Sequence, residues 1–243
     1  MIGNAPILDS SCSPEARVYF IDRDGGFYIK RAAAETLRRE AEMTAYFHTK
    51  GLSAEVLDYR TEAGFDWLVT ARVAGEDCTH ADYLADPKRL CDLLAARLRA
   101  LHETDFAGCP IQDRMRDYLA LADENYRAGR YDLSLFGDRS PYATADDAYA
   151  ALQAHRDGFG RDVLLHGDYC LPNILLDNWR FSGFIDLGNG GVGDRHVDLF
   201  WGAWTLWYNL STDRYRDRFF DTYGRDVINS DLLDAVAAAE IFG

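Results

Sequence analysis

The chain has 243 residues, of which 48% are hydrophobic and 27% charged, so it is long and apolar enough for a globular protein with a sizeable core. Its formal net charge of −14 disfavours nucleic acid and anionic membranes as partners and suits a cationic small molecule. The start of the sequence has no basic flank before a long apolar run, and no apolar stretch of about 18 residues occurs, so we expect neither a signal peptide nor a membrane span. The 5 cysteines are scattered without a CxxC pair, which is typical of reduced thiols in a cytoplasmic protein.

The first part of the chain is expected to be rich in strands. Turn sequences such as DRDGG and EAGF separate three β-forming segments, 18–22, 27–31 and 66–73. One helix over residues 32–51 interrupts them, with Leu37, Met43 and Phe47 on an apolar face. We therefore predict a strand-rich N-terminal lobe over residues 1–74.

After Gly75 the sequence takes on helical periodicity. A helix is expected to begin at Pro87, because proline suits the first helical position, and leucines recur there at helical spacing. Further helices are predicted near residues 113–128, 144–156, 194–209 and 231–241. These segments predict a larger, mainly helical lobe over residues 75–243.

Within this second part stands the stretch LLHGDYCLPNILLDNWRFSGFIDLG, residues 164–188. Asp168, Asn173 and Asp186 lie at the ends of its apolar runs, where each polar group costs desolvation energy. Residues 173–186 predict a β-hairpin with the turn DNWR, which would place Asn173 and Asp186 at the same end. Because Asp168 belongs to the loop just before the hairpin, we expect the three oxygen-bearing side chains to converge.

Two carboxylates and an amide in this order suit phosphoryl transfer. That reaction needs a carboxylate that accepts the proton of an attacking hydroxyl, and oxygen ligands that hold Mg²⁺ against phosphates. Protein kinases space the catalytic Asp and Asn as D-x-x-x-x-N and follow them with D-F-G, and DYCLPN and DLG reproduce that order here. The stretch therefore predicts Asp168 as the general base, and Asn173 and Asp186 as Mg²⁺ ligands.

The same stretch resembles the signature of the aminoglycoside 3'-phosphotransferases, bacterial antibiotic-resistance kinases with a protein-kinase-like fold. The sequence GVGDRHVDL continues the match, with Asp194 and Asp198 where that family carries acidic residues, and the likeness extends more thinly over nearly the whole chain. The resemblance implies an α+β fold of two lobes, a small antiparallel-sheet lobe and a larger helical one. It also implies ATP or GTP as the phosphoryl donor and a cationic aminoglycoside as the acceptor.

The resemblance implies a phosphate site in the first lobe. Ser13 would belong to the phosphate-binding loop, Lys30 would contact the α- and β-phosphates, and Glu40 would pair with Lys30. Other interpretations stay open, since Lys30 could be a solvated edge residue and Glu40 could pair with arginines of its own helix.

The resemblance also implies a site for the base. Tyr28 would stack on adenine, and the backbone of Ala71 and Val73 would hydrogen-bond the base. Tyr28 could equally be a core aromatic residue.

The acceptor half departs more from the family pattern. The ending AEIFG is close to the acidic and aromatic C-terminus that lines the family's acceptor pocket, which implies roles for Glu240 and Phe242. Asp138 would contact acceptor ammonium groups, and Asn189 stands where the family usually has arginine. Ala239 replaces one acid of the family's C-terminal pair. The nucleotide half is therefore expected to be intact and the acceptor half altered.

Several neighbouring residues favour structural roles. His166 is expected to brace the catalytic turn, Asp194 to cap the next helix, Asp198 to brace the catalytic loop, and Cys170 to fill space. An aromatic cluster is interpreted as a buried helix face, with one ring reaching the acceptor: Phe200, Trp201, Trp204, Trp207 and Tyr208.

The sequence favours an aminoglycoside phosphotransferase because every residue of the catalytic set is present. A kinase of another small amino sugar or metabolite is the first alternative, and a non-catalytic nucleotide-binding relative is the second. The choice of ATP over GTP, the acceptor hydroxyl and the oligomeric state stay open.

Overall fold

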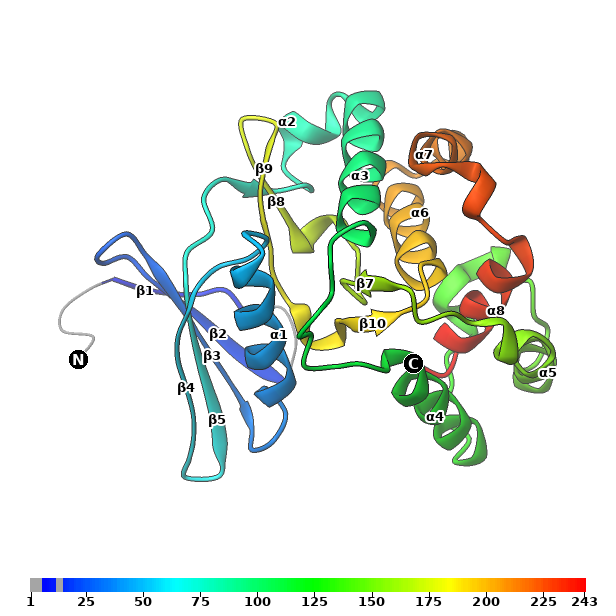
Figure 1. Cartoon of the computed structure of the whole chain (residues 1–243), viewed down its shortest axis with the longest axis horizontal. Helices are drawn as coiled ribbons and strands as arrows, with labels where there is room; N and C mark the ends of the chain where they lie inside the picture. Colours follow the sequence, from blue (N-terminus) through cyan, green and yellow to red (C-terminus); the bar gives the residue numbers. More distant parts are fainter. Residues whose placement is uncertain (1–5, 12–14) are drawn as a thin grey trace. The chain divides into compact units, whose positions relative to one another are not determined.

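The computed structural model describes residues 6–11 and 15–243 (Figure 1). Contacts divide the chain into two compact units, Met1–Tyr83 with Leu171–Gly190, and Leu84–Cys170 with Gly191–Gly243. The first unit thus contains the predicted hairpin, although helices flank the hairpin in the sequence. The functional boundary after residue 74 stays a prediction.

No helix within the described ranges is long and apolar enough to cross a membrane.

The first unit is built on a five-stranded antiparallel sheet, in the order β1-β2-β3-β5-β4. Its strands are β1 Ile7–Asp9, β2 Ala16–Ile21, β3 Phe27–Ala33, β4 Val56–Glu62 and β5 Phe65–Ala71. The three predicted strands correspond to β2, β3 and β5, whereas β1 and β4 were not predicted. The antiparallel sheet of the expected α+β fold is therefore confirmed.

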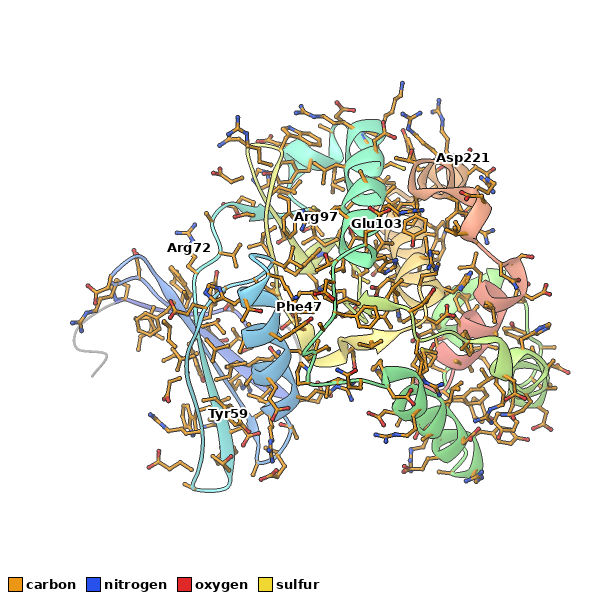
Figure 2. All side chains as sticks on the ribbon, viewed as in Figure 1. Phe47, Tyr59, Arg72, Arg97, Glu103 and Asp221 are labelled. Atoms are coloured by element: carbon orange, nitrogen blue, oxygen red, sulfur yellow. The ribbon has the colours of Figure 1, made fainter. Side chains whose placement is uncertain are left out.

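Helix α1, Arg38–Thr49, packs beside this sheet and begins later than the sequence indicated. Ala32 and Ala33 pair with β5 instead, so the predicted start at residue 32 is wrong. The buried carboxylate of Asp66 accepts a hydrogen bond of 2.9 Å from the Leu37 N–H, which supports the chain where it turns into the helix. On the same helix Phe47, labelled in Figure 2, is fully buried. Its ring centroid is 6.2 Å from that of Phe184.

The predicted hairpin is present in a second, three-stranded sheet of this unit. It consists of β8 Ile174–Asp177 and β9 Arg180–Phe184, and β6 Glu76–Asp77 pairs with β8. The two turn residues Asn178 and Trp179 both have positive φ, 50° and 65°, as a type I′ turn requires. Gly75 has a φ of 90°, and a Cβ there would clash with the Leu176 carbonyl, so only glycine fits.

The second unit is mainly helical. It contains α3 Pro87–His102, α4 Arg114–Arg127, α5 Ala145–His155, α6 His196–Leu210, α7 Arg216–Tyr223, α8 Ser230–Glu240 and the strand pair β7 Val163–Leu165 with β10 Gly191–Gly193. The five helices predicted for this part are confirmed, and α7 was not predicted. The predicted leucine stripe of α3 is fully buried: Leu90, Leu94, Leu98 and Leu101.

Side-chain caps explain where several of these helices begin. Asp86 accepts a 3.2 Å hydrogen bond from the Arg89 N–H at the start of α3, and Pro87 occupies the first turn as expected. Thr144 and Asp147 form a reciprocal capping box at the start of α5. Helices α4, α5, α6 and α8 then pack around one apolar cluster, which includes Phe242 near the chain end.

Candidate functional site

Lys30, on β3, lies at the centre of a charged cluster in the first unit. Its Nζ is 2.9 and 2.8 Å from the two carboxylate oxygens of Glu40 on α1, and 2.9 Å from Oδ1 of Asp186. Burial lowers the pKa of Lys30, but the charges of Glu40 and Asp186 outweigh that effect and raise the pKa, so the amine remains a cation. Lys30 therefore pairs with Glu40, as the resemblance implied, and its contact with phosphates stays a prediction.

Asn173 and Asp186 lie at the same end of the β8–β9 hairpin. The Ile185 N–H donates a 3.1 Å hydrogen bond to the Asn173 carbonyl, which fixes the backbone of the two segments together. Asp186 has a left-handed backbone with φ 56°, and half of its side chain is exposed, whereas Asn173 is buried. The predicted pairing of these two positions across the hairpin is confirmed.

The donor set at this hairpin end fits Mg²⁺. An amide oxygen and a carboxylate oxygen are hard ligands, and Mg²⁺ is usually held by one or two protein carboxylates together with phosphates and water. Across the described residues, no group of three His, Cys, Asp or Glu side chains is placed to hold a metal ion. A metal held by Asn173 and Asp186 would therefore need phosphate and water oxygens to complete its coordination.

The residues expected around the base belong to the same unit. Tyr28 lies two residues from Lys30 on β3 and so faces the same side of the sheet, with its ring 5.1 Å from that of Phe20 on β2. Phe20 was missed by the sequence analysis, although its pairing opposite Tyr28 follows from the β2–β3 register.

The backbone expected to bind the base is only partly available. The Ala71 N–H donates to the Glu55 carbonyl at 2.9 Å, so only the Ala71 carbonyl could receive a base. Val73 follows β5 with its side chain buried, and Ser13 lies outside the described residues. The roles of these three positions stay predictions.

Asp168 belongs to the second unit, on the turn that follows β7. Asp198, fully buried in the first turn of α6, accepts hydrogen bonds from the N–H groups of His166 at 2.8 Å and Gly167 at 2.7 Å. It also lies 3.2 Å from Nε2 of buried His102. The expected bracing of the catalytic loop by Asp198 is confirmed, whereas His102, far away in the sequence, was missed.

His166 supports the same turn from within. Its Nδ1 accepts a 3.3 Å hydrogen bond from the Asp168 N–H, which agrees with the structural role expected for it. The turn itself requires a glycine, because Gly167 has a φ of 84°. Asp168 and the Asn173–Asp186 pair belong to different units, so their convergence stays a prediction.

Two residues near the catalytic turn can be assigned from their surroundings. Burial raises the pKa of the Cys170 thiol far above its ordinary value, so it is not a thiolate nucleophile, in agreement with the sequence analysis. The predicted N-cap at Asp194 is one residue early, because α6 has Arg195 at that position. The Asp194 carboxylate still accepts the His196 N–H at 2.9 Å, and it accepts the Gly160 N–H at 2.6 Å.

Glu240, the last residue of α8, is held by two neutral donors. Its Oε1 accepts hydrogen bonds from the Tyr118 hydroxyl at 2.8 Å and from the Trp201 indole N–H at 3.0 Å. Burial raises the pKa of Glu240 to about 7, although the hydrogen bonds from Tyr118 and Trp201 and the charge of Arg114 act to lower it. Within the described part of the chain, Glu240 forms no ion pair. The sequence analysis missed the Tyr118 contact, since nothing local links residues so far apart.

The other expected acceptor residues are placed as follows. Phe242 is 1% exposed, and its ring packs edge-on against those of Tyr126 and Tyr149, which favours a structural role. Asn189 is exposed at the end of a short 3₁₀ helix, Leu187–Asn189, of the first unit. Asp138 lies in the 3₁₀ segment Leu133–Arg139, and its side chain is outside what the structure describes.

Comparisons with known proteins bear directly on this site. A profile of the phosphotransferase enzyme family matches residues 14–238. A probable aminoglycoside 3'-phosphotransferase of Lactococcus lactis is 50% identical over 99% of this chain and 91% of that protein. An aminoglycoside 3'-phosphotransferase of Niallia circulans is 32% identical, over 82% and 75% of the two chains.

Solved structures agree on the fold. An aminoglycoside 3'-phosphotransferase of type VIII superposes with a TM-score of 0.79 at 24% identity, over 98% of this chain and 94% of that one. An aminoglycoside phosphotransferase from Streptomyces rimosus, in complex with ADP and streptomycin, superposes with a TM-score of 0.80 at 22% identity, over 99% and 93%. The chain therefore belongs to the phosphotransferase enzyme family, together with the aminoglycoside 3'-phosphotransferases that the sequence resembles.

Proposed function

We propose that this protein transfers the γ-phosphoryl group of ATP to a hydroxyl of an aminoglycoside, with the 3' hydroxyl as the favoured position. The observation that carries the proposal is the cluster in which Lys30 contacts both Glu40 and Asp186. The cluster holds a cation and a potential metal ligand 2.9 Å apart. The names of the relatives that are 32% and 50% identical support the aminoglycoside as acceptor.

The nucleotide would be held by the first unit. Lys30, fixed as a cation by Glu40, would bind the α- and β-phosphates, while Asn173 and Asp186 would hold Mg²⁺. When bound, the ion would offset the negative charge that gathers on the phosphate oxygens. Tyr28 and Phe20 would supply aromatic surface for the base, and the Ala71 carbonyl would accept from its amino group.

The acceptor would be activated by the second unit. Asp168 would accept the proton of the acceptor hydroxyl while the hydroxyl oxygen forms a bond to the γ-phosphorus. The bond between the γ-phosphorus and the oxygen that bridges it to the β-phosphate would break, and ADP would leave. The hydrogen bonds from the turn to Asp198 keep the Asp168 backbone in place, so little reorganisation is needed at the reaction step. We expect this chemistry in the cytoplasm, where ATP is available.

Glu240 favours a cationic acceptor over a neutral one. A carboxylate that is partly buried and forms no ion pair within the described residues is costly, and an acceptor ammonium would provide an opposite charge. This disfavours a kinase of neutral sugars, and it leaves kinases of other amino sugars as the nearest alternative. A non-catalytic relative would have no need of the braced Asp168 turn.

The test is ADP release measured with a coupled assay, with mass spectrometry and NMR of the products. The acceptors are kanamycin B, neamine and streptomycin, and the comparison compounds are choline and galactose. We expect release of ADP with kanamycin B and neamine and a phosphate on their 3' oxygen. The proposal would be contradicted if ADP were released with choline or galactose but with none of the aminoglycosides.

A further inference from the structure

Helix α6 carries several large aromatic residues, and not all of them are buried in the core of the second unit. Trp201, Trp204 and Tyr208 are spaced by three and four residues, so they share one face of the helix, and we call them the aromatic row. Tyr208, at one end of the row, has an exposed fraction of 62%, which is the highest among the exposed large hydrophobic residues of the described chain. The row therefore runs from the interior of the second unit to solvent, and the expected buried helix face is only partly buried.

The rings of the row contact one another in sequence. The ring centroids of Trp201 and Trp204 are 5.3 Å apart at 77°, and those of Trp204 and Tyr208 are 4.9 Å apart at 12°, a stacked pair. Tyr208 is thus held against a tryptophan, so its outer face is presented in a fixed orientation. An exposed tyrosine with a supported ring offers a flat surface at little entropic cost.

The inner end of the row is joined to Glu240. The Trp201 indole N–H donates to Glu240 Oε1, and so does the Tyr118 hydroxyl, so both hydrogen bonds leave Oε2 for a ligand. An acceptor that places an ammonium group at Glu240 would therefore lie against the row.

The same helix also contacts the catalytic turn. Thr205, buried next to Trp204, hydrogen-bonds with the Cys170 thiol, and Cys170 in turn interacts with Asp168. One helix thus borders both the Asp168 turn and Glu240, within one unit of the chain. A molecule that reaches from Asp168 towards Glu240 has the outer part of α6 as its next surface.

We propose that the aromatic row is an acceptor subsite that binds an amino-sugar ring remote from the phosphorylated one. The occupant follows from the chemistry of the surface. An amino-sugar ring has an apolar C–H face that can lie on an aromatic ring, and an ammonium group that is attracted to the ring face and to Glu240. This assignment rests on the proposed function, and it determines which aminoglycosides are preferred.

The experiment compares two acceptors that share the reacting ring. Neamine has two rings, and kanamycin B has the same two rings plus a third that carries an amine. In wild type the third ring should lower KM. In Tyr208→Leu, which keeps an apolar side chain but removes the ring face, we expect the KM ratio of neamine to kanamycin B to fall roughly 3- to 20-fold. Tyr208→Phe, which keeps the ring, should stay close to the wild-type ratio.

Leu121→Ala is the matched control, because Leu121 is a half-exposed apolar side chain on α4, outside the row. It should leave both KM values unchanged. A binding measurement complements the kinetics: kanamycin B should change the tryptophan fluorescence of the wild-type protein, and the change should shrink in Trp204→Phe.

Two results would overturn the subsite. One is a ratio of neamine KM to kanamycin B KM that is unchanged in Tyr208→Leu. The other is an equal rise of the KM values for neamine and kanamycin B, which would mean that Tyr208 only keeps Glu240 in position. A wild-type protein that phosphorylates neither compound would instead count against the proposed function.

Discussion

The two units treat buried charge in opposite ways. In the first, Lys30 is surrounded by the carboxylates of Glu40 and Asp186, so a cation and its counter-charges are already assembled. In the second, Glu240 accepts hydrogen bonds from two neutral donors and forms no ion pair within the described residues. Burial raises its pKa to about 7, although the charge of Arg114 acts to lower it. The Lys30 cluster thus contains its own counter-charges, whereas Glu240 forms no ion pair within the described residues.

Under the proposed function, this difference would separate the two substrates. The Lys30 cluster would bind the same nucleotide phosphates in every turnover. Glu240 would gain most from an acceptor that brings a positive charge, and so would select acceptors by their ammonium groups.

Replacement of Asp168 should have the largest effect on turnover. In Asp168→Asn the side chain keeps its size but loses its proton-accepting ability, so kcat should fall by about 10²–10⁴-fold. Nucleotide affinity and Tm should stay near wild type, because Asp198 still holds the turn. Steady-state kinetics and calorimetry check this, with exposed Asp157→Asn as the control. More than a third of wild-type kcat in Asp168→Asn would disprove its role as base.

Removal of Asp186 should act on nucleotide binding through the metal ion. Asp186→Ala deletes the carboxylate ligand at the hairpin end, so Mg²⁺ should no longer tighten ATP binding. Isothermal titration of ATP with and without Mg²⁺ measures the effect. Asp177→Ala, an exposed carboxylate at the other end of the same hairpin, should keep the Mg²⁺ enhancement. An equal enhancement in both variants would place the metal elsewhere.

Of the two substrates, neutralisation of Glu240 should affect only the acceptor. Glu240→Gln keeps the shape but loses the charge, and we expect acceptor binding to weaken by roughly 1.5–3 kcal/mol, the range for a hydrogen bond to a charged group. Separate titrations should show a raised kanamycin B KM and an unchanged ATP KM. Exposed Asp234→Asn on the same helix controls for charge in general. If neither KM moves, Glu240 is structural.

The same substitution should change how stability depends on pH. The pKa of Glu240 is about 7 in the folded protein, above its ordinary 4.5, so between these values the folded state holds a proton that the unfolded state releases. This contribution to stability is therefore complete below pH 4.5 and is lost as pH rises to 7, by on the order of 3 kcal/mol. Thermal melts should show a smaller decline from pH 5 to 8 in Glu240→Gln than in wild type. Parallel declines in the two proteins would contradict the buried charge.

Much of the fold could be predicted because its elements carry local signals. The leucine spacing and Pro87 predicted α3, and the hairpin followed from its short turn. The start of α1 was wrong because Ala32 and Ala33, good helix formers, pair with β5. Strand β4 was missed because its sequence, VLDYRTE, is polar for a strand and lies at the sheet edge.

The candidate site was likewise predictable only in part. The positions of Asn173 and Asp186 could be predicted because a hairpin joins them, and the pair of Lys30 and Glu40 was implied by the family resemblance. The contacts of Glu240 could not be predicted, because Tyr118 and Trp201 reach it from helices that are distant in the sequence. Only tertiary packing brings such residues together.

The most direct test of this contrast is the number of protons exchanged when each substrate binds. Near pH 7, about half of the Glu240 side chains are protonated, so an ammonium that binds there should expel roughly 0.5 proton. Calorimetry in two buffers of different ionisation enthalpy measures this value for kanamycin B and for ATP, in wild type and in Glu240→Gln. We predict that kanamycin B binding releases roughly 0.5 proton more in wild type than in the variant, and that ATP binding shows no such difference. If kanamycin B binding released the same number of protons in the two proteins, Glu240 would not bind an ammonium group of the acceptor.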